Sequence, residues 1–286
     1  MSNLVSYLFK TNAFKVCPNN KPFWYTSGKI GPYFINTHFL YGSEESAVEF
    51  LSFIDIEKDN KLELPKKVLE KTLAQYNSNN IYKEVIDEMI SFINTHINVD
   101  EIDYVSGGER RDWFFSDLVA YLLGKPHITI FKDLSTVVST PDFEETSIKK
   151  DLHGKKVLHI ADLVTAASSY VRAWIPAVQA LNAEIVWSVV VVDRMQGGND
   201  RLKDLGIEAY SLVQIAPDMF KKALDLGIIT EEQNIMLNKF YEDPDGTMRN
   251  FLIDHPEFLE NALNSDEKTV VRARLCIEGD LYGLKG

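Results

Sequence analysis

The middle of this chain repeats one pattern: a short apolar run, a polar turn, and then apolar positions three or four residues apart. Residues 155–181 show it most clearly, because the apolar run Val157–Ile160 leads into a lone acid, Asp162. A turn of small residues follows, and the next apolar positions have helical spacing: Val171, Trp174, Val178 and Leu181. The order predicts a strand, a turn and a helix. Such a turn either binds a phosphate through its N–H groups or only caps the helix.

The same alternation continues on both sides of this segment. Strands are predicted at residues 102–105, 127–131, 184–193 and 209–212, and helices at 112–123, with Asp112 as N-cap, and 199–205. Strands that alternate with helices favour an α/β fold in which a parallel sheet is flanked by helices. Right-handed crossovers would gather the polar turns at one edge of that sheet, where such folds bind ligands: the turns at Gly107, Phe131, Asp162 and Arg194.

The flanking segments read differently. Residues 2–12, 44–55 and 65–96 are expected to be helical, residues 23–40 to form strand, turn and strand, and the chain from 216 onward to consist of short helices. The polar stretch 133–154 has no strong period and is long for a connection within a domain. Loops of that kind are usually functional lids or are disordered.

Composition narrows the class of protein. The 286 residues are 45% hydrophobic and 25% charged, as in globular proteins with a real core. The net charge of −12, from 30 basic and 42 acidic residues, argues against a nucleic-acid or anionic-membrane partner. No apolar run approaches the roughly 18–20 residues of a membrane span, and the N-terminus does not resemble a secretory signal. Cys17 and Cys276 have no metal or disulfide spacing, so a cytoplasmic protein is expected.

Four motifs follow one another along the chain. They are Ser27-Gly28-Lys29 with Pro32-Tyr33-Phe34 and Asn36, Ser106-Gly107-Gly108 with Leu123-Gly124-Lys125-Pro126 after a helix, Ala161 to Ser169, and Asp193-Arg194-Met195-Gln196-Gly197-Gly198. In this order and spacing they resemble the motifs of type I phosphoribosyltransferases, and most closely those of the orotate phosphoribosyltransferase branch. The resemblance covers roughly residues 1–42 and 98–213.

The resemblance implies transfer of ribose 5-phosphate from phosphoribosyl pyrophosphate to a base, with Mg²⁺ held through the substrate. It implies catalytic roles for Asp162 and Lys132. The phosphoribosyl group would bind to Thr165, Ala166, Ala167, Ser168 and Ser169. The pyrophosphate would bind to Gly107, Gly108, Arg110 and Arg111. The base would meet Arg194, Lys29, Tyr33 and Phe34.

The resemblance also divides the chain into parts. It implies a phosphoribosyltransferase-like domain over residues 1–215, made of an N-terminal hood at 1–42, a helical insertion at 43–97 and a core at 98–215. Residues 216–286 would form a C-terminal helical extension. A homodimer that acts on small molecules, without a nucleic-acid or membrane partner, is expected.

The chain departs from the family pattern at several positions. Ala161 stands where the family has the first of two adjacent acids, and Ala167 stands where it has a glycine, so a positive φ there would strain the turn. The segment Leu134–Ser147 has no Lys or Arg, whereas the family's mobile loop carries a Lys. Two hypotheses therefore stay open, an enzyme with an altered cradle and a non-catalytic protein that binds a nucleotide or phosphorylated metabolite. A transcription regulator on this fold is disfavoured by the acidic charge.

Overall fold

The computed structural model describes residues 3–18 and 21–284, which fall into two compact units. The first unit contains residues up to Ala13 together with Thr37–Ile215. The second contains Phe14–Asn36 together with the chain from Ala216 onward. This division differs from the one expected from the sequence, because residues 14–36 of the expected hood group with the C-terminal helices.

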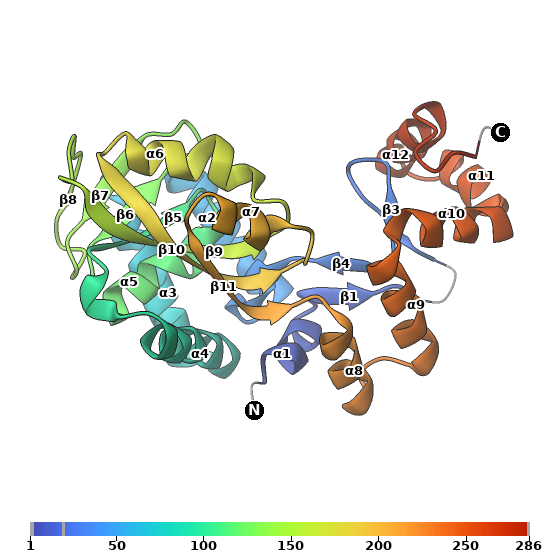
Figure 1. The fold of residues 1–286 in the computed structure, drawn as a ribbon, viewed down its shortest axis with the longest axis horizontal. Helices are drawn as coiled ribbons and strands as arrows, with labels where there is room; N and C mark the ends of the chain where they lie inside the picture. Colours follow the sequence, from blue (N-terminus) through green and yellow to red (C-terminus); the bar gives the residue numbers. More distant parts are fainter. Residues whose placement is uncertain (1–2, 19–20, 285–286) are drawn as a thin grey trace. The chain divides into compact units, whose positions relative to one another are not determined.

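A seven-stranded sheet forms the centre of the first unit (Figure 1). Its strands, in spatial order, are β11 (Glu208–Gln214), β10 (Ala183–Asp193), β9 (Lys155–Val164), β5 (Tyr104–Gly108), β6 (His127–Ile130), β7 (Thr136–Ser139) and β8 (Thr146–Ser147). The first five run parallel, whereas β7 and β8 are antiparallel to their neighbours. The expected α/β fold with a parallel sheet is confirmed. The antiparallel pair was not expected.

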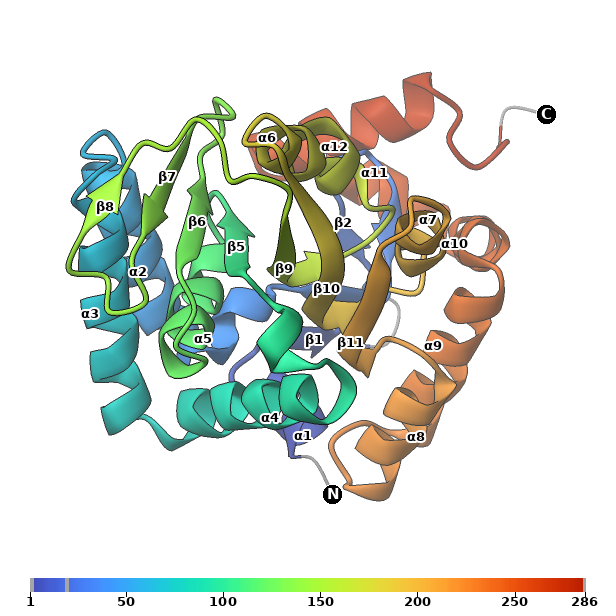
Figure 2. The same ribbon diagram turned by 60° about the vertical axis from the view of Figure 1, so that its left-hand side comes forward.

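Helices cover this sheet, and α5 packs along β5 while α6 packs along β10 (Figure 2). The α-helices of the unit are α1 (Leu4–Lys10), α2 (Glu44–Glu57), α3 (Leu64–Ser78), α4 (Asn80–His96), α5 (Ser116–Leu122), α6 (Ile175–Gln179) and α7 (Gly198–Asp204). Three 3₁₀ turns and one π-helical turn complete it: η1 (Thr37–Tyr41), η2 (Val99–Glu101), η3 (Asp112–Phe114) and the π turn η4 (Tyr170–Trp174). Asn79 separates α3 from α4 and caps α4 through its side chain, as its propensity predicts.

One core cluster of the first unit lies between the sheet and the helical segment that follows β9. Strand β10, predicted at residues 184–193, is paired on both sides. Its β-branched residues Val189–Val192 are fully buried, as is typical of a central parallel strand. Tyr170, Trp174 and Val178 pack against the sheet from η4 and α6. The end of β9 and the turn after it are therefore fixed by buried side chains on both sides.

The second unit combines short N-terminal strands with C-terminal helices. Its strands pair antiparallel as β1 (Phe14–Val16) with β4 (Tyr33–Ile35) and β2 (Phe23–Trp24) with β3 (Ile30–Gly31). Its helices are α8 (Pro217–Asp225), α9 (Glu231–Glu242), α10 (Pro244–Asp254), α11 (Glu257–Leu263) and α12 (Glu267–Glu278). The Trp24 ring stacks on Phe258 at 5.5 Å, and the Ile30 N–H donates to the Tyr282 hydroxyl at 2.8 Å. The two segments thus share one core. Within the described ranges no helix has the length and apolar character needed to cross a membrane.

The stretch 133–154 corrects a sequence-based expectation. It was expected to be a long lid or a disordered loop, but β7 and β8 form a hairpin that extends the sheet from β6. Lysines of the helical insertion hold this hairpin. The Lys61 ammonium lies 2.5 Å from the Asp133 carboxylate, and Lys66 lies 2.6 Å from Glu144. Asp133 and Glu144 are therefore paired with insertion residues, whereas Asp142 and Glu145 are exposed.

Candidate active site

One cavity of about 540 Å³ opens in the first unit at the carboxyl ends of β5 and β9. One wall is the turn after β5, and the other is the end of β9 with its turn and the first residues of the helix. The lining residues are Glu109, Arg110, Arg111, Asp112, Ala161 to Tyr170, and Trp174. Because β5 and β9 are parallel neighbours, their carboxyl ends meet at one edge, as the strand pattern predicted.

The turn from Thr165 to Ser169 lines this cavity along its whole length. It follows the last residue of β9 directly and leads into the π turn η4, a feature often found at functional sites. Ala167 lies in the left-handed region with φ = +51°, where an L-residue other than glycine pays roughly 1–2 kcal/mol. The conditional expectation of strain at this alanine is thus confirmed. Neighbouring structure must hold the turn in place.

The β5 side of the cavity is built on two glycines that permit close packing. A Cβ on Gly107 would lie 2.1 Å from the Ser116 hydroxyl oxygen, and a Cβ on Gly108 would lie 2.3 Å from the Trp174 ring. Both glycines are buried in β5, and the lining residues begin just after them, at Glu109. The glycines therefore bring the turn close to Trp174.

Two arginines follow these glycines and differ in their surroundings. Arg110 forms an ion pair with Asp55 of α2, so the helical insertion contacts the cavity wall. Arg111 is exposed and lines the cavity, and its positive charge lowers the pKa of Asp162. The peptide bond between Glu109 and Arg110 is cis. Arg111 is thus the cation that acts most directly on the acid of β9.

Asp162 is nearly buried, with 8% of its surface exposed, and it faces a second acid. Burial and the adjacent negative charge of Asp112 raise the pKa of Asp162 to about 7, and Arg111 only partly opposes them. The sequence analysis treated Asp112 as a helix cap and did not include it in the site. That assignment is wrong, because η3 has no side-chain cap and both Asp112 oxygens accept hydrogen bonds from strand residues.

Lys132 follows β6 and is held through its backbone. Its N–H donates to the Glu109 carboxylate at 2.8 Å, which joins the turns after β5 and β6. The side chain of Lys132 is exposed and lies outside the residues that line the cavity. Glu109 was absent from the candidate residues, although it both lines the cavity and positions this turn.

Arg194 lies in the turn after β10, next to the cavity. Its N–H donates to the Val164 carbonyl at 3.0 Å, and a Cβ on Gly198 would lie 2.6 Å from the Thr165 carbonyl oxygen. The Asp193-Arg194 motif therefore packs directly on the start of the turn Thr165 to Ser169. The Arg194 side chain is not part of the cavity wall.

The other three residues predicted to bind a base belong to the second unit. Lys29 forms an ion pair with Asp245 of α10 at 2.7 Å. Tyr33 is buried, stacks on Phe14 at 4.9 Å and meets the Phe240 ring edge-on. Phe34 has 41% of its surface exposed. Of these two aromatic residues, Tyr33 is a core residue of the unit and Phe34 is exposed.

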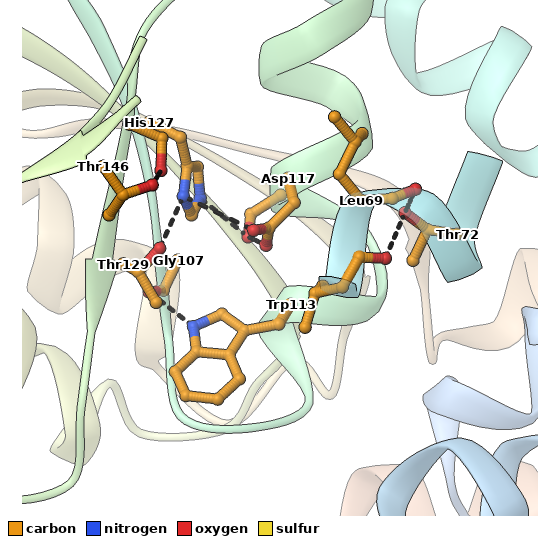
Figure 3. A network of polar contacts seen from close by, with 11 residues as sticks. Leu69, Thr72, Gly107, Trp113, Asp117, His127, Thr129 and Thr146 are labelled. Carbon is orange, nitrogen blue, oxygen red and sulfur yellow. Dashed lines mark hydrogen bonds and ion pairs between the residues drawn. The ribbon is translucent and has the colours of Figure 1, made fainter. Parts of the chain in front are cut away.

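A fully buried polar network joins α5 to β6 (Figure 3). The two ring nitrogens of His127 each lie 3.0 Å from a hydroxyl, Nε2 from Ser116 and Nδ1 from Thr129. Asp117 accepts from Ser116 at 3.2 Å and lies 3.7 Å from His127. Nearby, the Trp113 indole donates to the Gly107 carbonyl at 3.1 Å. Serine, histidine and aspartate meet here, but all three are fully buried, so the network holds α5 against β6 and cannot meet a substrate.

Four further residues of the first unit are fully buried. Trp113, Phe114 and Phe115 are fully buried packing residues. His159 is buried, and its Nδ1 lies 2.9 Å from the Ser106 hydroxyl. No group of three or more His, Cys, Asp or Glu side chains among the described residues is arranged to hold a metal ion.

Known proteins resemble this chain both in sequence and in fold, although no family model matches it. Adenine phosphoribosyltransferase of Butyrivibrio fibrisolvens is 30% identical over 132 residues, which span 43% of this chain and 70% of that protein. Orotate phosphoribosyltransferase of Sulfolobus acidocaldarius is 22% identical over 165 residues, 57% of this chain and 78% of that protein.

A solved structure supports the same relationship at the level of fold. Orotate phosphoribosyltransferase of Francisella tularensis superposes with a TM-score of 0.56 at 15% identity, covering 84% of this chain and 98% of that one. At that identity the superposition shows the fold alone. The family relationship rests on the sequence similarity to the Butyrivibrio fibrisolvens protein. Together with the cavity between the turns after β5 and β9, they show that this chain belongs to the type I phosphoribosyltransferase family.

Proposed function

We propose that this protein is an orotate-type phosphoribosyltransferase in nucleotide biosynthesis or salvage. In this reaction the bond between C1 of the ribose and pyrophosphate breaks, and pyrophosphate leaves with the electron pair. A bond forms between C1 and a nitrogen of a pyrimidine-like base, which loses its proton. The proposal includes a homodimer in the cytoplasm.

The observation that carries the proposal is the composition of one cavity. A turn rich in N–H and hydroxyl donors, a nearly buried acid and an exposed arginine line it together: Thr165 to Ser169, Asp162 and Arg111. These groups match the parts of phosphoribosyl pyrophosphate, which carries a 5-phosphate, ribose hydroxyls and a pyrophosphate.

Each group would have a separate task. The turn would bind the 5-phosphate, the Asp162 carboxylate would accept hydrogen bonds from ribose hydroxyls, and Arg111 would stabilise charge on the departing pyrophosphate. Arg110 would join it after exchanging Asp55 for the ligand, and Lys132 would approach from the turn after β6. Mg²⁺ would bind together with the phosphate oxygens of the substrate and neutralise part of their charge.

The base end of the site rests on fewer observations. Arg194 follows β10 in the turn that packs on Val164 and Thr165, and a guanidinium there suits the carboxylate of orotate. The roles of Lys29, Tyr33 and Phe34 stay predictions from the family resemblance, because Lys29 pairs with Asp245 and Tyr33 is buried in the core of the second unit. Because the relatives include adenine and orotate enzymes, adenine is the necessary competitor in any assay.

The direct experiment incubates the protein with Mg²⁺, phosphoribosyl pyrophosphate and one base at a time, orotate, uracil or adenine, and measures pyrophosphate. Orotate is expected to give the fastest release. Asp162→Asn and Arg111→Ala are expected to lower kcat/KM by about 100-fold, equal to about 2.7 kcal/mol, as loss of charge-assisted contacts should. Lys155→Ala is the control, because Lys155 begins β9 at the opposite edge of the sheet and pairs with Asp103. Full activity in both cavity variants would remove the site assignment.

A second candidate function is non-catalytic binding of a nucleotide or phosphorylated metabolite. The hairpin of β7 and β8 favours it, because Leu134–Ser147 has no Lys or Arg, and Asp133 and Glu144 pair with lysines of the insertion. A segment held in this way brings no cation to a leaving pyrophosphate. Calorimetric binding of phosphoribosyl pyrophosphate without pyrophosphate release from any base would select this function.

A further inference from the structure

Asp112 joins the two walls of the cavity. It is the first residue of η3, only 5% of its surface is exposed, and it lines the cavity. One carboxylate oxygen accepts from the Asp162 N–H at 3.0 Å, and the other accepts from the Gly108 N–H at 3.0 Å. Each bond is buried, and together they link the ends of β5 and β9. A residue that only began a helix would instead bond to the next backbone N–H groups.

Asp112 also controls the electrostatic surroundings of Asp162. The charged and titratable groups facing Asp162 are Asp112 and Arg111 from the turn after β5, and Tyr170 from η4. The Tyr170 hydroxyl is paired with Ser188 at 2.7 Å. His159 lies on the other side of Asp112, with its Nε2 3.7 Å from the carboxylate, and its Nδ1 is paired with Ser106. Asp112 is therefore the acid nearest to Asp162, and Arg111 is the opposing charge.

Ala161 stands before Asp162, where the family resemblance implies a further acid. Asp112 brings a second carboxylate to the same cavity from η3, 50 residues away along the chain. The ends of the two strands are fixed by its hydrogen bonds, so this carboxylate cannot move far from Asp162. The cavity therefore holds the Asp112 carboxylate beside that of Asp162, although the sequence motif around Asp162 holds one acid.

We propose that Asp112 is a positioning residue for phosphoribosyl binding, which acts through Asp162 by holding its backbone against the turn after β5 and by setting the charge of its carboxyl group. This inference rests on the proposed binding of phosphoribosyl pyrophosphate. The ribose hydroxyls bind best to an ionised Asp162, because a carboxylate accepts two hydrogen bonds without giving one. Affinity should then rise as the pH rises through about 7, the pKa of Asp162.

The neutral variant Asp112→Asn tests the role of the charge. It keeps one oxygen acceptor and removes the negative charge, so the pKa of Asp162 should fall by at least about one unit. The amide nitrogen cannot accept from the second backbone N–H, so one of the two hydrogen bonds is lost as well. In the full-length protein without ligand, carbon-13 NMR of the Asp162 carboxyl group should give a midpoint near 7 for the wild type and a clearly lower one for Asp112→Asn. Asp142→Asn, a change of the same kind in the exposed hairpin turn, should leave the midpoint unchanged.

Calorimetry with Mg²⁺ and phosphoribosyl pyrophosphate then gives the functional result. Wild-type affinity should rise several-fold from pH 6 to pH 8 relative to Asp112→Asn, which corrects for titration of the ligand itself. If the ligand does not bind at all, the proposed function fails, while the NMR titration still decides the role of Asp112. A wild-type midpoint near 4, or the same midpoint in both proteins, would overturn the inference. Asp112→Ser serves as a second neutral variant should Asp112→Asn not fold.

Discussion

Gly108 and Trp174 offer the sharpest stability test of the cavity. Gly108 has an ordinary backbone conformation, so alanine at this position is opposed only by space. Its Cβ would lie 2.3, 2.4 and 2.5 Å from three atoms of the Trp174 six-membered ring, where ordinary contact begins at 3.4 Å. The ring would have to move by roughly 1 Å, although it is buried among β9, η4 and the sheet. Overpacking of this kind costs about 1–3 kcal/mol.

The expected size of the effect follows from that overlap. If Gly108→Ala costs about 2 kcal/mol of unfolding free energy, Tm should fall by roughly 4–8 °C, because about 1 kcal/mol shifts Tm by roughly 2–4 °C in a unit of this size. Phosphoribosyl pyrophosphate should also bind more weakly, because the indole that must move lines the cavity. Trp174→Leu alone should cost about 2–4 kcal/mol from lost packing. In the Trp174→Leu background the added methyl group has room, so Gly108→Ala should be neutral or slightly stabilising there.

A double-mutant cycle measures this coupling. Urea-induced unfolding of the wild type, both single variants and the double variant should give a coupling energy of at least about 1 kcal/mol. Costs that simply add to within about 0.5 kcal/mol would show that Gly108 is not held by contact with Trp174. In that case its place in β5 would need a different explanation, such as close approach of a ligand.

Two further predictions concern charges away from the cavity mouth. Burial raises the pKa of Asp117 well above its usual range, so the native state keeps a proton that the unfolded state releases above about pH 4, and stability falls as the pH rises. Asp117→Asn should therefore leave Tm nearly unchanged at pH 4 and raise it relative to wild type at pH 8; a constant difference across that range would contradict this. A hydrogen bond from Lys61 holds the pKa of Asp133 well below its usual range, so the stability from this pair is present above about pH 4 and lost in acid. Lys61→Ala should speed hydrogen exchange of β7 amides by up to about fivefold at neutral pH, as expected for an exposed pair, whereas Lys83→Ala in α4 should not.

Much of the first unit follows from sequence periodicity. The strands β5, β6, β9, β10 and β11 and the helices α2 to α4 stand where apolar spacing predicted them, because each carries a strong local period. The gathering of the turns at one edge follows from parallel strands alone. The turn at residues 165–169 was also predicted, together with the strain at Ala167.

The features that escaped prediction depend on partners far along the chain. Asp112 reads as a helix cap because caps and cross-strand acceptors use the same residue types, and only the position of Asp162 distinguishes them. The strands β7 and β8 have four and two residues, too few for a clear period. Asp133 and Glu144, which flank β7, are paired with Lys61 and Lys66 from the insertion. Glu109 gave no local signal, because its role is a bond to the Lys132 backbone.

The second unit joins two segments that are far apart in sequence, and they are therefore synthesised at different times. Residues 14–36 leave the ribosome early, but their packing partners Asp245, Phe258 and Tyr282 lie more than 200 residues later. At about 5–20 residues per second, translation would leave this segment without its core for roughly 10–40 s. During that interval Phe23, Trp24 and Phe34 are available to chaperones or to other nascent chains. Residues 37–215 of the first unit emerge consecutively. The first unit can therefore fold before the C-terminal helices that pack on residues 14–36 are synthesised.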